Sequence, residues 1–517
     1  MFKKKVSRLL NYPIRKAAKI VYALPVKEDG WNQLRLIHFF LNYVDCFYLF
    51  KTKTYSLMKV MAILSLTKKI TFLKLLYKME AYAGIDIDDK MWGGFSSFIE
   101  RNVGRAYSRQ ARIKFIECSV EVLLTDSFYG KSSRSAGSAL HNIKKILEYL
   151  ELPESCLEVE RYVLGCAEYT FSITDSIPKL PEVDSAIEAW QLLLLERVSA
   201  MLGFLASSNV FREKAKTLLV YNALENESFL SKAKAKMAFF AAVENYDYES
   251  AKRIIAKTRT KDMFFLKVMS FMYYLFVGDK VYEKYFKVLC RGEERRFADF
   301  IADKTVAIVA PLPVQSGSGE DIDAHDYVLR MGALGHPIDL DPKKYGSRTD
   351  IGSFNVMDLQ SSKYTKSGKL VIGRELKYLV FKNLKKSKFK GEVVDTPLVR
   401  KRTLQGGVIT LNNYTNHVPE LVLFLLGSGA KIVSLYSMNF FMSKATYVKS
   451  YRDLPSAHTL YYAGDNLIIG HRYLKRLYEL GLIHCDESAR EVIELSTEQY
   501  MQNMENLYRD TIRFKSK

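Results

Sequence analysis

The stretch Thr305-Val-Ala-Ile-Val-Ala310, followed directly by Pro311-Leu-Pro-Val-Gln-Ser-Gly-Ser-Gly319, decides the fold of the C-terminal part of the chain. The first six residues are short, apolar and β-branched and are bounded by prolines, which is typical of a buried strand. A flexible Gly/Ser loop at the carboxyl end of such a strand is a normal nucleotide site, because glycine allows close backbone approach and free N–H groups hold phosphate oxygens. An ordinary turn is the alternative. The absence of a Walker A motif and of G-x-G-x-x-G argues against ATP and dinucleotides.

Three further segments have the composition of strands, and helical patterns lie between them. The strands are predicted at Tyr327–Met331, 407–411 and 431–436, and the helices at 418–426 and 471–480. Strands that alternate with helices imply a mostly parallel sheet with helices on both faces. Residues 301–517 are therefore predicted to form a Rossmann-like α/β/α domain, with the lysine-rich stretch 382–390 in an exposed loop or helix face.

Residues 26–300 are predicted to be all-helical, with long apolar-periodic runs such as 186–206 and 263–276. Two linkers, Asn245-Tyr-Asp-Tyr-Glu-Ser-Ala251 and Gly278-Asp-Lys-Val-Tyr-Glu-Lys284, each join two of these helices, and their Tyr-Glu pairs lie 282 − 248 = 34 residues apart. This spacing predicts tetratricopeptide-like helical hairpins near 210–300, which could bind a protein partner. A plain helical bundle is the alternative.

Charge and cysteine usage restrict the partners and the compartment. The chain of 517 residues has 77 Lys+Arg against 57 Asp+Glu, a net charge of +20, which favours anionic partners or simply a basic solvated surface. Six scattered cysteines without a C-x-x-C pair predict a reducing, cytoplasmic location. No apolar run is long enough to span a membrane, and no secretory signal is expected.

The N-terminal segment, residues 1–25, is basic and amphipathic. Residues 1–24 carry seven basic residues and no acidic one, with apolar residues at roughly helical spacing and Pro13 as an interruption. Such a segment predicts peripheral contact with an anionic membrane at the inner face of the cell membrane. A docked helix with a solvated basic face is the alternative.

Several ordered segments resemble the sialylmotifs of the eukaryotic-type sialyltransferases. Residues 306–332 contain Ser316-Gly-Ser-Gly-Glu-Asp-Ile-Asp-Ala-His-Asp326 and Tyr327-Val-Leu-Arg330, and they are similar to the large sialylmotif. Tyr345-Gly-Ser-Arg-Thr-Asp350 resembles the family's next conserved segment. Tyr414-Thr-Asn-His-Val-Pro419 and Ala430-Lys-Ile-Val-Ser-Leu-Tyr436 are similar to the small sialylmotif, and 440–447 resembles a segment of bacterial sialyltransferases. The resemblance covers about 190 residues and leaves residues 1–300 outside it.

The resemblance implies a bacterial, inverting glycosyltransferase that uses neither a metal nor another cofactor. Its donor would be a CMP-activated acidic ulosonic sugar, sialic acid or Kdo, and its acceptor a cell-surface glycan or glycolipid. The loop 312–319 would face the donor, residues 415–417 would meet its phosphate at a helix start, and 436–441 would wall the cytidine. The implied donor-binding residues are Leu312, Gln315, Ser316, Gly317, Ser318, Gly319, Arg330, Asn355, Thr415, Asn416, His417, Tyr436 and Asn439.

An inverting transfer needs a base that takes the proton of the acceptor hydroxyl. The family places a histidine before an Arg-Leu-x-x-x-Gly helix, which corresponds to Arg476-Leu-Tyr-Glu-Leu-Gly481. The candidates are His458, Asp465 and His471. His458 is favoured because it lies in a polar loop, whereas His471 begins a helix and has a structural alternative.

The sequence also departs from the family pattern. The paired cysteines are replaced, with Ala430 at the small-motif position, and the asparagine that usually follows the Arg-x pair is replaced by Gly332. Two other functions therefore stay open: a catalytically inactive helical-repeat adaptor, and an RNA-binding protein suggested by the charge. No RNA-binding signature supports the latter, and no nucleic-acid partner is predicted.

Overall fold

The computed structural model describes residues 136–225, 228–310, 317–331, 340–354, 416–443 and 466–513, with shorter pieces at 312–313, 365–366, 369–370, 376–381, 398–400, 404 and 408–412 and six isolated residues between 113 and 124. The chain divides into two compact units. One comprises Met1–Leu194 with Arg513–Lys517, and the other comprises Leu195–Ile512. The basic segment 1–25 lies outside the described residues, and the predicted division of the chain at residue 301 stays a prediction.

The described part of the first unit is helical. It contains α8 (Ala136–Leu150), the short 3-10 helix η1 (Glu154–Cys156), α9 (Leu157–Thr170) and the beginning of α10 (Ala189–Met201). In α8 the buried residues Ile143, Ile146, Leu147 and Leu150 recur at three- and four-residue spacing. That stripe is the apolar face of an amphipathic helix, and α8 packs against α9.

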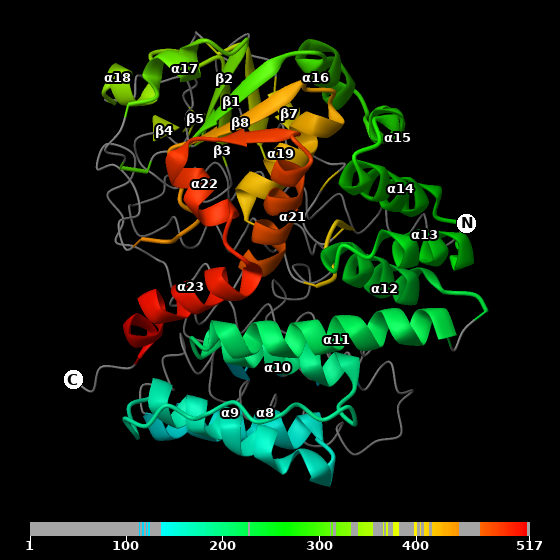
Figure 1. Cartoon of the computed structure of the whole chain (residues 1–517), viewed down its shortest axis with the longest axis vertical. Coiled ribbons are helices and arrows are strands. Elements are labelled where there is room, and N and C mark those ends of the chain that lie inside the picture. Colours follow the sequence, from blue (N-terminus) through cyan, green and yellow to red (C-terminus); the bar gives the residue numbers. More distant parts are fainter. Residues whose placement is uncertain are drawn as a thin grey trace, which may run out of the picture. The chain divides into compact units, whose positions relative to one another are not determined.

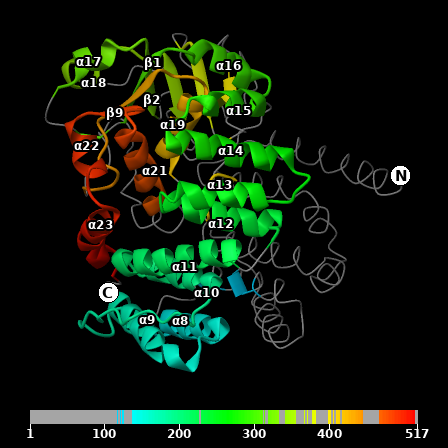
Figure 2. The same ribbon diagram turned by 45° about the vertical axis from the view of Figure 1, so that its right-hand side comes forward.

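The second unit begins with a series of helices, as the sequence predicts. Their bounds are α11 (Leu205–Glu225), α12 (Lys232–Glu244), α13 (Tyr248–Lys257), α14 (Met263–Val277), α15 (Val281–Leu289) and α16 (Glu293–Ile301). Consecutive helices from α11 to α15 pack on one another (Figures 1 and 2). The run 186–206 is not one helix, because it ends at Met201 and restarts at Leu205 after Gly203, which adopts a left-handed φ of 87°.

Both predicted linkers join two helices. Asp247 begins α13 by accepting a hydrogen bond from the Ser250 N–H at 3.0 Å, and Gly278 ends α14 with a φ of 82°. These are the standard signals for helix start and stop. The helices therefore form hairpins α12–α13 and α14–α15, whereas their assignment to the tetratricopeptide class stays a prediction.

A parallel sheet of seven strands follows the helices, which confirms the predicted Rossmann-like fold. Its order is β7-β6-β3-β2-β1-β8-β9, and every pair of neighbours is parallel. The strands are β1 (Thr305–Val309), β2 (Tyr327–Met331), β3 (Ile351–Phe354), β6 (Tyr378–Phe381), β7 (Leu398–Arg400), β8 (Ile432–Tyr436) and β9 (Ile483–Cys485). Two short strands, β4 (Thr365–Lys366) and β5 (Lys369–Leu370), form a separate antiparallel pair.

Helices cover both faces of the sheet. The helices that the structure describes in this region are α17 (Gly319–Asp323), α18 (Pro342–Tyr345), α19 (His417–Gly427), α21 (Leu467–Glu479), α22 (Glu487–Ile493) and α23 (Thr497–Ile512). On one face Ile322 of α17 and Tyr345 of α18 pack with Ala307, Val309 and Val328 of the strands. On the other face Phe297 of α16 contacts Phe424 of α19 at 5.4 Å and Tyr378 of β6 at 5.2 Å between ring centroids.

The predicted strand at 407–411 is wrong for its described part. Residue 408 is in a 3-10 conformation and residues 409–412 form bends, so none of these positions is in a strand. Ile409 and Leu411 are buried, and the Ile409 carbonyl accepts a hydrogen bond from the Tyr473 hydroxyl of α21 at 2.9 Å. The apolar residues therefore pack against a helix, and burial without strand pairing accounts for the β-like composition. The lysine-rich stretch 382–390 lies outside the described residues.

Candidate functional site

The strand order reverses next to β1. From β1 the chain moves to β2, β3, β6 and β7 on one side, whereas β8 and β9 lie on the other side. In open parallel sheets, ligands bind at the carboxyl ends of the strands beside such a switch point. The ends of β1 and β8 are joined there, because the Ala310 N–H donates to the Tyr436 carbonyl at 3.0 Å. Chemically active side chains are therefore expected at this edge.

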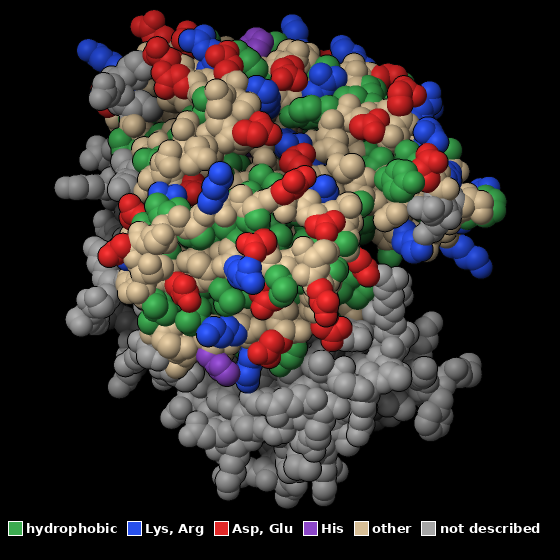
Figure 3. Space-filling view, turned by 60° about the horizontal axis from the view of Figure 1, so that its bottom comes forward, with side chains coloured by type: hydrophobic (Ala, Val, Ile, Leu, Met, Phe, Trp, Pro, Cys, Tyr) green, Lys and Arg blue, Asp and Glu red, His purple; other side chains and the backbone are tan. Residues whose placement is uncertain are grey.

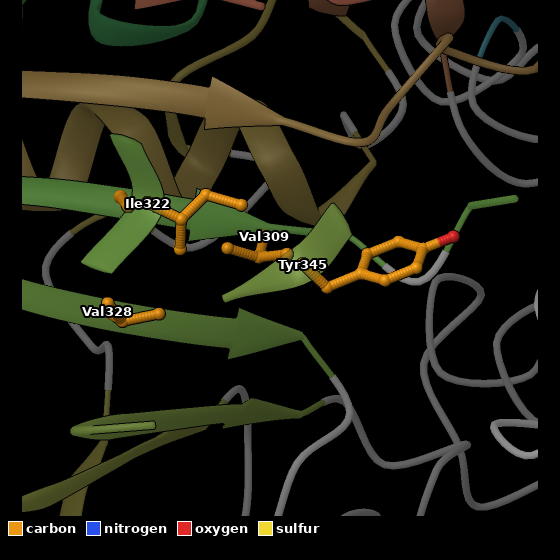
Figure 4. Close-up of a cluster of buried hydrophobic side chains, with 5 residues drawn as sticks. Val309, Ile322, Val328 and Tyr345 are labelled. Atoms are coloured by element: carbon orange, nitrogen blue, oxygen red, sulfur yellow. The ribbon is translucent and has the colours of Figure 1, made fainter. Parts of the chain in front are cut away.

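The loop after β1 is held against α18. The Tyr345 hydroxyl donates to the Leu312 carbonyl at 2.9 Å, and the Tyr345 ring extends past the strand ends toward this loop (Figure 4). A Cβ atom at Gly317 would lie 2.6 Å from the Lys343 carbonyl oxygen, and one at Gly319 would lie 2.0 Å from the Pro342 carbonyl oxygen. Both glycines thus permit close backbone packing. Gln315 and Ser316 lie outside the described residues.

Arg330 fastens the segment after α18 to β2. Its side chain is buried and donates from Nη2 to the carbonyls of Tyr345 and Gly346 at 2.7 and 2.9 Å, and from Nε to the Arg348 carbonyl at 3.0 Å. Burial lowers the pKa of Arg330 to about 10, against the opposing attraction of Asp323. These contacts give Arg330 a structural role, and a contact with a donor stays a prediction.

Asp323 and Asp326 of the sialylmotif-like run, together with Arg348, hold neighbouring segments together through hydrogen bonds, and we call this network the brace. Asp323 accepts hydrogen bonds from the Ser347 N–H and hydroxyl at 2.7 and 2.8 Å, and Asp326 accepts them from the Thr305 N–H and hydroxyl at 2.8 and 3.0 Å. Burial opposes the ionisation of Asp323, but the hydrogen bonds from Ser347 and Arg348 outweigh it and lower the pKa of that carboxyl. Asp326 lies at the start of β2, opposite the carboxyl edge.

Arg348 completes this brace. Its guanidinium donates to the carbonyls of Asp323, His325 and Asp326 at 2.8 to 2.9 Å and pairs with Asp350 at 2.9 Å. The Asp350 carboxylate in turn accepts the Val328 N–H at 2.9 Å. The two sialylmotif-like segments around 320–326 and 345–350 are thus joined to each other by hydrogen bonds. These contacts give the polar residues of both segments a structural role.

A histidine and a serine meet at the carboxyl edge. His417 is the first residue of α19, and its Nε2 lies 2.8 Å from the hydroxyl of Ser353, which is fully buried near the end of β3. The N-terminus of this 11-residue helix carries a partial positive charge, which favours anions. The pair therefore supplies an oriented hydrogen-bonding ring beside a site suited to phosphate. His417 is predicted from the sequence as a site residue, whereas Ser353 is not.

The backbone after β8 is strained and held by other elements. Ser437, Phe440 and Phe441 adopt left-handed φ values of 55°, 47° and 72°, which are uncommon for residues other than glycine. The Tyr500 and Tyr508 hydroxyls of α23 donate to the carbonyls of Phe440 and Phe441 at 2.9 and 2.6 Å. Strained backbone of this kind is frequent at ligand sites.

Side chains around this segment are also fixed. The Ser437 N–H donates to the Asp486 carboxylate at 2.7 Å, and the Asn439 amide donates to the Ser443 hydroxyl at 2.7 Å. Burial raises the pKa of Tyr436 to about 12, so its hydroxyl stays protonated. Tyr436 and Asn439 are predicted from the sequence, whereas Asp486 is not; its signal is an N-cap position just after a short strand.

The candidate bases are only partly described. His458 and Asp465 lie outside the described residues, as do the predicted donor contacts Asn355 and Thr415. His471 is buried within α21, where its ring stacks on Tyr500 at 4.5 Å and its Nε2 lies 3.0 Å from the Val492 carbonyl oxygen. Burial lowers the pKa of His471 to about 4. These surroundings match the structural alternative, and its catalytic role stays a prediction.

The described residues contain neither a candidate metal centre nor a candidate membrane span. No group of three or more His, Cys, Asp or Glu side chains is arranged to hold a metal ion in the part of the chain that the structure describes. None of the described helices is long and apolar enough to cross a membrane.

Comparisons with known proteins give similarity at the level of structure but not of sequence. Neither a protein-family model nor a curated protein matches the sequence. Among solved structures the chain is similar to a mammalian sialyltransferase in complex with Gal-beta-1-3GalNAc-ortho-nitrophenol. The two are 12% identical with a TM-score of 0.27 over 45% of this chain and 88% of the other. At that score the similarity does not support an argument about activity, and the proposal below rests on the site and on the motifs.

Proposed function

We propose that the chain is an inverting glycosyltransferase that transfers an acidic ulosonic sugar, sialic acid or Kdo, from a CMP-sugar to a cell-surface glycan or glycolipid. The observation that carries the proposal is the His417–Ser353 pair. His417 lies in the first turn of α19, within a segment that resembles the small sialylmotif, and Ser353 lies near the carboxyl end of β3 in the parallel sheet. Cytoplasmic location, absence of a metal requirement and peripheral membrane attachment belong to the same proposal.

In this proposal the donor phosphate lies at the N-terminus of α19. The helix dipole and backbone N–H groups at this end of α19 would stabilise it, and the His417 ring would donate a hydrogen bond to it. The charge that develops on the phosphate as CMP leaves is then stabilised by groups that are already in place. Ser353 acts as a positioning residue, because it is buried and fixes one ring nitrogen of His417.

The transfer itself is a single displacement at the anomeric carbon. The acceptor oxygen forms the new glycosidic bond while the bond to the CMP oxygen breaks, and the acceptor proton passes to a base. We propose His458 as that base, with Asp465 as the alternative, because the surroundings of His471 leave its ring buried and stacked. Tyr436 and the strained residues after β8 would form a wall of the cytidine site.

One observation favours a non-enzymatic alternative. The glycines of the predicted donor loop are accounted for by close packing on Pro342 and Lys343, and the motif acids are accounted for by the brace around Arg348. A fold that retains these contacts could serve as an inactive adaptor whose helical hairpins bind a protein. The experiment must therefore separate a fold that binds CMP from a fold that only resembles one.

Thermal unfolding with nucleotides tests the proposal. CMP at about 100 times its Kd should stabilise the native protein by about 2.7 kcal/mol, because it binds only the folded state. UDP and GDP should do less. His417→Ala should lose most of the CMP shift, and Ser353→Ala should lose part of it.

His484→Ala is the control. His484 is an exposed histidine of β9 and is not among the residues proposed to contact the donor. This variant should keep the CMP shift after correction for its own melting temperature. Equal shifts from CMP, UDP and GDP, or a full CMP shift in His417→Ala, would refute the assignment. CMP release from CMP-sialic acid or CMP-Kdo distinguishes an enzyme from an adaptor.

A further inference from the structure

Two links between helices run side by side at one end of the second unit. The Leu230 N–H donates to the Lys257 carbonyl at 3.0 Å, and the Arg259 N–H donates to the Leu230 carbonyl at 2.9 Å, so that Leu230 and Thr258 form a parallel β-bridge. Leu230 and Thr258 are buried. The link before α12 and the link before α14 are therefore one fixed element. We define residues 228–234 and 258–264 as the hairpin tip.

The hairpin tip exposes large apolar side chains. Phe229 and Met263 are 59% and 58% exposed, and Phe264 is 36% exposed. Their neighbours Leu230 and Phe265 are buried and anchor the two links in the helical packing. The exposed side chains thus project from a fixed backbone. An exposed apolar group of this kind is a typical feature of an interaction surface.

The hairpin tip is also strongly basic. Lys232, Lys234, Arg259 and Lys261 are exposed, against one acidic residue, Asp262, which gives a net charge of 4 − 1 = +3 for these two segments. The Arg259 guanidinium lies 4.6 Å from the centroid of the Phe229 ring. Basic and hydrophobic side chains lie next to one another on the projection at the right-hand side of Figure 3.

From this combination we propose that the hairpin tip is a contact site for an anionic membrane surface. Phe229 and Met263 would enter the headgroup region while the lysines and Arg259 lie at the lipid phosphates. The backbone groups of Leu230 and Arg259 are already hydrogen-bonded to each other across the links, so the main-chain cost of entering a poorly hydrated region is reduced there. The inference does not depend on the transferase activity.

This site differs from the predicted attachment through residues 1–24. The N-terminal segment is predicted from its sequence, whereas the hairpin tip is a folded surface of the unit Leu195–Ile512. Two separate contacts would restrict the orientation of that unit at the membrane more than a single contact does. Substitutions in the hairpin tip should therefore weaken binding even when residues 1–24 are intact.

The test is sedimentation of the full chain with vesicles of about 30% phosphatidylglycerol in phosphatidylcholine and with pure phosphatidylcholine vesicles. The variant is Phe229→Ser/Met263→Ser. The matched control is Val281→Ser/Val288→Ser, two valines of α15 that are 41% and 52% exposed. We expect the hairpin-tip variant to bind the anionic vesicles at least tenfold more weakly than the wild type and the control variant. Binding of the wild type should fall as salt rises.

A second variant measures insertion directly. Phe229→Trp in the full chain should add a tryptophan signal that shifts to shorter wavelength with anionic vesicles and is quenched by lipids labelled near the headgroup. The proposal is overturned if the hairpin-tip variant binds like the wild type, if both double variants lose binding equally, or if emission from the introduced tryptophan does not respond to vesicles. It is also overturned if the substitutions weaken binding to a short RNA and leave vesicle binding unchanged.

Discussion

Substitution of Arg212 by methionine should destabilise the second unit strongly. Arg212 of α11 is fully buried, and its guanidinium donates to Glu244 at 2.8 and 2.9 Å and to Glu196 at 2.7 Å. The amides of Asn412 and Asn466 also donate to Glu196, at 3.0 Å each. Burial alone would lower the pKa of Arg212, but the two carboxylates outweigh it and raise that pKa above its usual value.

The size of the effect follows from what the substitution leaves behind. Arg212→Met places Glu196 and Glu244 in one buried region without a cation between them. Breaking a buried ion pair by removing one partner costs about 3–5 kcal/mol, a large part of the roughly 5–15 kcal/mol that stabilises a domain. We expect a loss of about 4 kcal/mol. Arg212→Met/Glu244→Gln removes one of the two charges and should be more stable than Arg212→Met alone.

Urea unfolding of the full chain, followed by circular dichroism, measures both variants. The control is Lys232→Met, which removes an exposed ion pair with Asp262 at 2.6 Å and should change stability by about 0.5 kcal/mol or less. The single variant Glu244→Gln completes the double-mutant cycle, from which we expect a coupling energy of about 2 kcal/mol or more. The reasoning is wrong if Arg212→Met unfolds within about 1 kcal/mol of the wild type, or if the two substitutions are simply additive.

Three further predictions concern His471, the donor loop and metals. The folded-state pKa of His471, about 4, lies below its ordinary value of 6.5, so the unfolded chain takes up the proton first and the protein loses up to about 3 kcal/mol of stability as pH falls from 6.5 toward 4. His471→Phe should flatten this dependence of unfolding free energy on pH in urea titrations. An unchanged dependence would contradict the lowered pKa of His471. Gly319→Ala should lower stability by about 1–3 kcal/mol, because the added Cβ would lie 2.0 Å from the Pro342 carbonyl oxygen. Gly137→Ala is the control, because the added Cβ would have open space around it. If Gly319→Ala keeps normal stability but binds CMP more weakly, Gly319 contacts the donor instead. CMP release should persist in EDTA, and a loss that magnesium or manganese restores would point to another class of transferase.

Local chemistry was sufficient to predict the fold class. The short β-branched run of β1 between a lysine and prolines favours a buried strand, and the longer apolar run of α19 favours a buried helix. Helix ends such as Asp247 and Gly278 carry their own signals, since a side-chain cap and a left-handed φ act within a few residues. The helical region and the alternating α/β region were predicted for these reasons, whereas 407–411 was wrong because burial and strand pairing give the same composition.

Only the tertiary structure decided which residues meet. Ser353 and His417 are 64 residues apart, and Arg212 and Asn412 are 200 residues apart. Strands as short as β7 and β9, with three residues each, have no periodicity that a sequence pattern could detect. The sequence determined the elements because their causes are local. Their parallel order, the brace around Arg348 and the His417–Ser353 pair depend on crossovers that bring distant segments together, and no local signal specifies those distances.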